Sequence, residues 1–184
     1  MPNWCENHIS FSGKLDELQK FLEVIKDETS DCGYSLFEKL YPTPQELLDT
    51  NASVVSKEEM SDQQKSNVEK YGHADWYDWR TSNWGTKWTE SELRLEQELH
   101  TSVQGISSIA FGFETAWGPA IELFDKVTKD YPNILICLYY EEPGMGFCGT
   151  NVWANGSCMQ SQESELVNSY FDEDYLYSEA FGTK

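Results

Sequence analysis

The chain has 184 residues, of which 39% are hydrophobic and 14% aromatic, and 32 acidic against 13 basic residues give a formal charge of −19. This aromatic content excludes a wholly disordered chain, because acidic disordered segments contain few aromatic residues. The charge excludes electrostatic binding of the surface as a whole to nucleic acid or anionic membranes. The start of the sequence does not resemble a signal peptide, and no apolar run approaches a membrane span of roughly 20 residues.

The cysteines and histidines predict neither disulfides nor a metal site. The chain has five cysteines, an odd number, and no two of them form a CxxC pair. Without a secretory signal, free thiols in a reducing compartment are expected. The sequence has only three histidines, so a metal site would need distant residues to converge. We therefore expect no metal and no cofactor.

The N-terminal segment 3–12 predicts a strand because apolar and polar side chains alternate along it. Ile9 and Phe11 fall on one side, and Glu6 and His8 fall on the other. This alternation predicts that one side of the strand faces the core and the other faces solvent.

A helix is predicted over 14–26, where leucines recur at helical spacing. Pro44 favours the start of a short helix through 45–48. Residues 49–70 are polar and are expected to form a mobile excursion with some helix. The aromatic segment 76–88 then follows and is the least ordinary part of the sequence.

Regular alternation returns in two predicted strands, 92–100 and 106–114, which the segment 101–105 joins as a hairpin. Pro119 favours the start of the next helix, whose apolar face ends near Pro132.

The apolar run 134–142 is typical of a central strand. A turn at 143–146 leads into a returning strand over 147–154. The remaining residues, 155–184, form an acidic extension, within which the segment 164–177 is expected to dock as a helix or strand, or to fray.

The order of the first six elements matches the ferredoxin-like β-α-β-β-α-β order. The predicted fold is α+β: an antiparallel sheet with two helices on one face, a long insertion after the first helix, and an extra C-terminal strand or tail. We expect one domain over 1–184, with the insertion at about 27–91 and the acidic extension at about 155–184.

Three motifs resemble the YubB-type ferredoxin-like proteins of phages and plasmids. These motifs are Pro2–Asn7 (PNWCEN), Asn83–Trp88 (NWGTKW) and Phe113–Pro119 (FETAWGP). The resemblance covers a little over half of the chain. It implies a ferredoxin-like fold, a mobile-element origin and the cytoplasm of a bacterial host cell. It implies no reaction and no catalytic residues.

Four tryptophans lie within 76–88, together with Arg80 and Lys87. One interpretation is a ligand site, because indole rings stack on nucleobases and a guanidinium binds phosphate. The other is that the tryptophans pack a long connection onto the sheet, while Arg80 and Lys87 pair with Asp75 or Asp78. The ligand-site interpretation gains support if the three motifs converge on one surface. Its candidate residues are Trp4, Asn7, Arg80, Asn83, Trp84, Lys87, Trp88, Thr115 and Trp117.

Thr115 has a second interpretation. It lies between a predicted strand and the helix that starts at Pro119, so it is a candidate cap for that helix.

The sequence predicts no catalytic residues. Glu141 and Glu142 are adjacent and would point to opposite faces of a strand, and Cys5 and His8 would do the same. No Walker loop, nucleophile elbow or HExxH motif is present.

We therefore expect a non-enzymatic phage or plasmid accessory protein that sequesters a host component, a nucleotide-like small anion, to counter host defence. One alternative is an acidic inhibitor of a basic host nucleic-acid-binding protein or nuclease, in which carboxylates imitate DNA phosphates. Another alternative is a small nucleotide-processing enzyme. Direct binding to nucleic acid or membrane is not expected.

Overall fold

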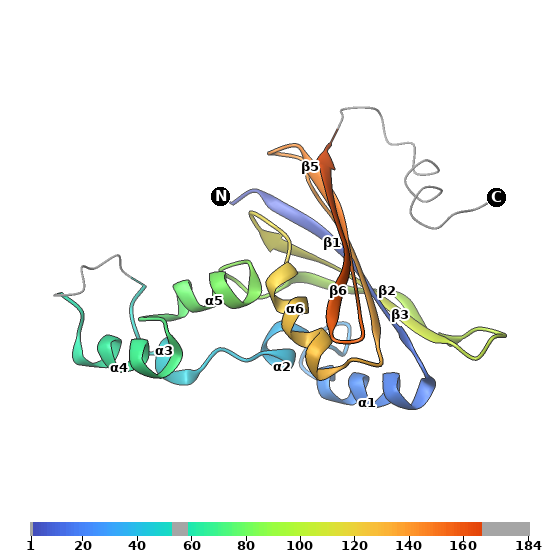
Figure 1. Cartoon of the computed structure of the whole chain (residues 1–184), viewed down its shortest axis with the longest axis horizontal. Helices are drawn as coiled ribbons and strands as arrows, with labels where there is room; N and C mark the ends of the chain where they lie inside the picture. Colours follow the sequence, from blue (N-terminus) through green and yellow to red (C-terminus); the bar gives the residue numbers. More distant parts are fainter. Residues whose placement is uncertain (1, 53–58, 167–184) are drawn as a thin grey trace.

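The computed structural model describes residues 2–52 and 59–166. Its centre is one antiparallel six-stranded sheet with the strand order β2-β3-β1-β4-β5-β6 (Figure 1). The strands are β1 (Trp4–Gly13), β2 (Ser91–Thr101), β3 (Ser107–Ala116), β4 (Leu135–Glu142), β5 (Phe147–Ala154) and β6 (Ser157–Glu165). The first four strands have the arrangement β2-β3-β1-β4, which agrees with the predicted α+β fold with an antiparallel sheet.

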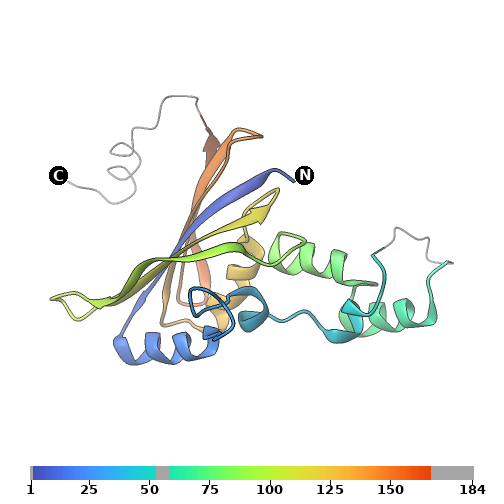
Figure 2. The same cartoon turned by 180° about the vertical axis from the view of Figure 1, so that it is seen from behind.

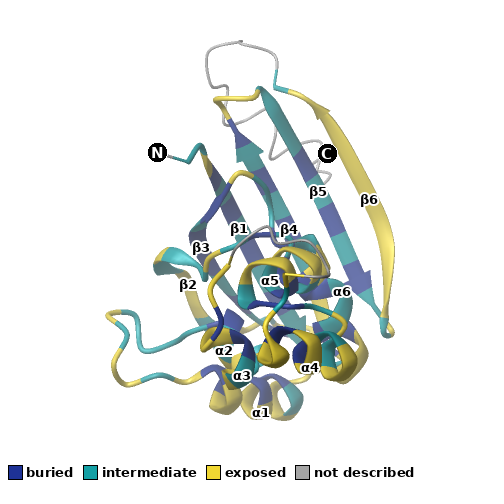
Figure 3. Ribbon diagram, turned by 90° about the vertical axis from the view of Figure 1, so that its left-hand side faces the viewer, coloured by how far each residue is buried: buried dark blue, intermediate teal, exposed yellow. Residues whose placement is uncertain are grey.

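Six helices are described: α1 (Leu15–Ile25), α2 (Phe37–Leu40), α3 (Gln45–Leu48), α4 (Asp62–Tyr71), α5 (Trp76–Trp84) and α6 (Ile121–Asp130). The two that pack directly on the sheet, α1 and α6, lie on the same face of it (Figure 3). The insertion between α1 and β2 carries α2 to α5. Its distal part, with α3 and α4, projects away from the sheet, as the reverse view also shows (Figure 2).

Strand β1 separates the core from the opposite face. Ile9 and Phe11 are buried under the helices, whereas Glu6 and His8 alternate with them and stay partly exposed. None of the described helices covers the side that carries Glu6 and His8. We call this side the helix-free face.

The aromatic segment forms a helix that the sequence pattern did not predict. Asp75 caps α5, because its side chain accepts hydrogen bonds from the N–H groups of Tyr77 and Asp78. Gly85 ends the helix with a φ of 83°, where glycine is favoured. A Cβ at Gly85 would also lie 2.9 Å from the carbonyl oxygen of Pro119, so glycine allows the close approach of α5 to α6.

The acidic extension begins with a strand, not with a tail. Strand β6 (Ser157–Glu165) pairs with β5 along its whole length and forms the edge of the sheet. Both faces of β6 are exposed, so its sequence, Ser-Cys-Met-Gln-Ser-Gln-Glu-Ser-Glu, lacks the alternation of apolar and polar residues that predicts a strand. Within the polar segment 49–70, α4 accounts for the expected helix, and residues 53–58 lie outside the described residues. Residues 167–184, which hold most of the segment 164–177, also lie outside the described residues.

Glu90 ties the insertion to the sheet. Its carboxylate accepts hydrogen bonds from the Ser35 hydroxyl (3.0 Å), the Phe37 N–H (3.2 Å) and the Leu36 N–H. Burial raises the pKa of Glu90, although these hydrogen bonds oppose the rise. The folded protein therefore holds the Glu90 proton more tightly than the unfolded chain does.

We predict that Glu90→Gln changes how stability depends on pH. In the wild type, ionisation of Glu90 lowers the free energy of unfolding as the pH rises from about 4.5, its ordinary pKa, through its raised folded-state pKa. The glutamine cannot titrate, so urea denaturation in this range should show a less steep decline with pH. Exposed Glu98→Gln is the control, and an unchanged slope in Glu90→Gln would contradict the prediction.

Candidate functional site

The helix-free face carries a row of directly opposed carboxylates. Glu6 on the central strand β1 is paired in register with Glu114 on β3 and with Glu141 on β4. Directly opposite residues of antiparallel strands point to the same face and lie close together. Like charges in such pairs destabilise a sheet, so this row costs stability in the isolated protein.

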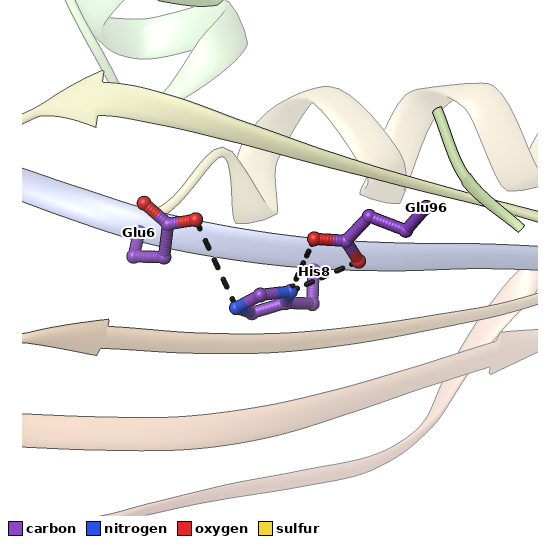
Figure 4. Close-up of side chains that lie close together, drawn as sticks. All are labelled: Glu6, His8 and Glu96. Atoms are coloured by element: carbon purple, nitrogen blue, oxygen red, sulfur yellow. Dashed lines mark hydrogen bonds and ion pairs between the residues drawn. The ribbon is translucent and has the colours of Figure 1, made fainter. Parts of the chain in front are cut away.

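Beside this row, Arg94 and His8 form a network with Glu6 and Glu96. Figure 4 shows the contacts of His8 in this network. The Arg94 guanidinium donates to Glu96 at 2.9 Å and also to Glu6. The His8 Nδ1 lies 2.9 and 3.0 Å from the two Glu96 oxygens, and its Nε2 lies 3.9 Å from Glu6. A carboxylate only accepts, so the Nδ1 atom carries the hydrogen in this arrangement.

The possible metal-ligand atoms of Glu6, His8 and Glu96 lie within 4.8 Å of one another, close enough for one metal ion to bind all three. The Arg94 guanidinium nitrogen, however, already bonds to both carboxylates. The two carboxylates also face different nitrogens of the His8 ring. These contacts fit an ion-pair network, and a metal ion would have to displace Arg94.

Tyr139 extends the site toward β4. Its ring lies 6.0 Å from the His8 ring, and its hydroxyl donates to Glu141 at 3.0 Å. Burial and this hydrogen bond raise the pKa of Tyr139, which keeps the phenol protonated as a donor. The face therefore combines aromatic rings with carboxylates.

The three motifs singled out in the sequence meet at one end of the sheet. Trp4 is paired with Ala116, whose carbonyl accepts from the Thr86 hydroxyl at 3.1 Å. The Trp117 N–H donates to the Asn3 carbonyl at 2.9 Å. The rings of Trp4 and Trp88 lie 6.1 Å apart.

Trp4, Trp88 and Trp117 stay 37%, 39% and 47% exposed at this end. Trp117 has a φ of 76°, which is uncommon for a bulky residue. The Lys87 ammonium lies 4.1 Å from the centre of the Trp88 ring. This end of the sheet thus exposes aromatic surface beside one cation.

Two other predicted site residues belong to the core layer instead. Trp84 is fully buried, and its Nε1 donates to the Tyr41 carbonyl at 2.9 Å. Arg80 is 14% exposed and donates to Glu38 at 2.8 Å and to the Thr43 hydroxyl at 2.9 Å. The interpretation that Arg80 pairs with Asp75 or Asp78 is wrong, because its described ion pair is with Glu38, and the Asp75 side chain caps α5 instead.

The remaining predicted residues also make internal contacts. Asn7 is buried and donates to the Thr115 hydroxyl at 2.8 Å, and Thr115 donates to the Gly118 carbonyl at 2.7 Å. Thr115 is therefore not the cap of α6, which begins after Ala120 without a side-chain cap. Asn83 donates to the Trp79 carbonyl within α5 at 2.7 Å.

An open depression of about 690 Å³ adjoins the helix-free face beside β2, and it shares Arg94 and Glu114 with that face. The carboxylates along its lining are Asp27, Asp31, Glu90, Glu92 and Glu114. It therefore extends the acidic surface around the edge of the sheet.

Cys5, on the core side of β1, is not set up as a nucleophile. Cys5 is buried, and burial raises the pKa of its thiol to about 12. Cys5 and His8 lie on opposite sides of β1, as the alternation predicted. Within the described residues, the hydrogen bonds of the His8 ring go to Glu96.

Comparison with known proteins places the chain in a family. A family model described as the ferredoxin-like domain in Api92-like proteins matches residues 83–175. The chain belongs to the Api92-like family. The crystal structure of Api92 from Yersinia pseudotuberculosis matches with a TM-score of 0.52, at 10% identity, over 93% of this chain and 100% of that one. No curated protein matches the chain.

The Api92-like assignment supports the ferredoxin-like fold and leaves the resemblance to YubB-type proteins a prediction. At 10% identity, the match to Api92 is a likeness of fold alone. None of the described helices is long and apolar enough to cross a membrane.

Sequence reasoning did not select Glu6, His8, Arg94, Glu96, Glu114 or Glu141 as a site. The available signal was the alternation along β1, which placed Glu6 and His8 opposite the core side. The register that sets Glu6 between two glutamates joins segments more than 100 residues apart, and no local pattern encodes it.

We predict that Arg80 supports the fold. Arg80→Ala should lower the free energy of unfolding by about 1–3 kcal/mol, because it removes hydrogen bonds to a charged and a polar partner in a nearly buried place. Exposed Lys39→Ala is the control. Urea denaturation measures both, and equal stability of the two variants would contradict a structural role for Arg80.

Proposed function

We propose that the protein is a non-enzymatic binding protein whose helix-free face docks a basic protein of the host cell. The observation that carries this proposal is the carboxylate row Glu114–Glu6–Glu141. Glu96 lies beside this row, and the four carboxylates share one neighbouring guanidinium, that of Arg94. A cationic partner would relieve the repulsion within this row. The row thus gives the partner a favourable interaction that the free protein lacks.

The surroundings of the row favour the same class of partner. The formal charge of −19 attracts basic proteins over long range. Aromatic rings on the face, such as Trp4 and Tyr139, offer surfaces on which cationic side chains stack. The resemblance to phage and plasmid proteins supports a nucleic-acid-binding protein or nuclease of the host as the partner, and the countering of host defence as the purpose.

Removal of charge from the carboxylate row should weaken the binding of cationic peptides. The double variant Glu114→Gln/Glu141→Gln should bind a fluorescent oligoarginine or oligolysine peptide about three- to tenfold more weakly than the wild type, because two partly exposed charges are lost. Fluorescence anisotropy at low ionic strength measures the affinity. The variant should also resist urea at least as well as the wild type, because it removes repulsion.

The matched control is Glu23→Gln/Glu69→Gln, which removes two exposed charges from the helices and leaves the face intact. The proposal requires this control to bind like the wild type. Equal losses in both double variants would show that only net charge matters, and absence of peptide binding at low ionic strength would sink the proposal.

The exposed tryptophan end favours a second candidate function, the sequestration of a nucleotide-like small anion. Its supporting observation is that Trp4 and Trp88, from separate motifs, lie together with the Lys87 ammonium above Trp88. The indoles would stack on a base, and Lys87 would pair with phosphate. The nearby carboxylate row opposes an anion, so this candidate ranks second.

For this candidate, mononucleotides should quench the tryptophan fluorescence of the wild type. Trp88→Ala should weaken the binding about tenfold, the effect of losing one stacking contact, and Lys87→Gln should weaken it because the charge that pairs with phosphate is lost. Arg80→Lys is the control, because the hydrogen bonds of Arg80 go to Glu38 and Thr43 within the insertion. The absence of saturable quenching, or equal affinity in all variants, would exclude nucleotide sequestration here.

A further inference from the structure

Arg94 lies in a seat that the helix-free face forms for a guanidinium group. Gly112 on β3 is paired with both His8 and Arg94. A Cβ at Gly112 would collide with the Arg94 guanidinium and with the Glu96 carboxylate. The ends of both side chains therefore lie directly over Gly112, in space that a side chain at this position would occupy.

The walls of the seat come from two carboxylates on different strands. Glu6 on β1 and Glu96 on β2 both accept from the same Arg94 nitrogen, and the His8 ring holds the Glu96 carboxylate in place. Because both bonds leave one nitrogen, an ammonium could form them as well, but the guanidinium also covers Gly112 with its central carbon and that nitrogen, a contact that a compact ammonium would make less completely. The seat therefore favours arginine over lysine.

The seat is open to solvent. The side chain of Arg94 is 42% exposed, and those of Glu6 and Glu96 are 27% and 29% exposed. Ion pairs at such exposed positions contribute little to stability. Arg94 can consequently leave the seat when another guanidinium offers the same bonds.

We infer that this seat recognises an arginine side chain of the basic partner and that Arg94 occupies it in the free protein as an internal competitor. The inference rests on the proposed function and names its partner chemistry. On binding, the partner's guanidinium takes the place between Glu6 and Glu96, and Arg94 swings into solvent. The exchange replaces one set of ion pairs with another and leaves the carboxylates satisfied.

The test compares peptides of equal length, an oligoarginine and an oligolysine, on the full chain in the presence of EDTA, so that metal binding plays no part. Arg94→Gln should raise the affinity for oligoarginine about three- to fivefold, because the competitor is gone. The affinity for oligolysine should rise less. Exposed Lys129→Gln on α6 changes the net charge by the same amount and should raise neither affinity selectively.

The double variant Arg94→Gln/Glu6→Gln should lose the gain for oligoarginine, because one wall of the seat no longer carries a charge. Thermal melts show whether each variant is folded, and Arg94→Lys provides a second, conservative replacement that should also favour oligoarginine. An equal gain for both peptides, no gain, or the same gain in Lys129→Gln would overturn the inference and leave the proposed function standing. Failure of every variant to bind either peptide would instead overturn the proposed function.

Discussion

The two-residue period of β1 is the constraint on which the structure depends. This strand lies between β3 and β4, so its two faces define the two sides of the sheet centre. Ile9 and Phe11 bury apolar area against the helices, which fixes the register, because a shift by one residue would bury Glu6 and His8 instead. The same alternation obliges the charged side chains to meet on the opposite face.

The insertion depends on this sheet in turn. Trp84 fills the core beside Phe37, with the ring centres 5.4 Å apart, and Glu90 holds the backbone of the segment before α2. Arg80 closes the layer by joining α5 to Glu38 and Thr43. The aromatic segment is thus divided in role: its first part packs, and its last part, with Trp88, reaches the exposed end of the sheet beside Trp4.

Charge is distributed unevenly between these parts. The chain has only two arginines, and both form ion pairs, Arg80 in the insertion and Arg94 on the helix-free face. The carboxylates on the helix-free face outnumber their cationic neighbour, whereas Arg80 lies within a nearly buried network. The excess carboxylates on the helix-free face are therefore available to bind a cationic partner, whereas the Glu38 carboxylate is already paired with Arg80.

The sequence by itself determined the order of the elements, the ferredoxin-like class and the two sides of β1, because periodicity and punctuation by proline and glycine are properties of neighbours along the chain. It did not reveal β6 or α5, since an exposed polar strand and a helix aromatic on several sides lack a clear period. Only the tertiary structure decided that Glu6 faces two glutamates, that Arg94 reaches it, and that Trp84 is core while Trp88 is exposed. Those facts depend on strand register and on contacts between residues as far apart as His8 and Glu96, 88 positions along the chain, which local sequence does not encode.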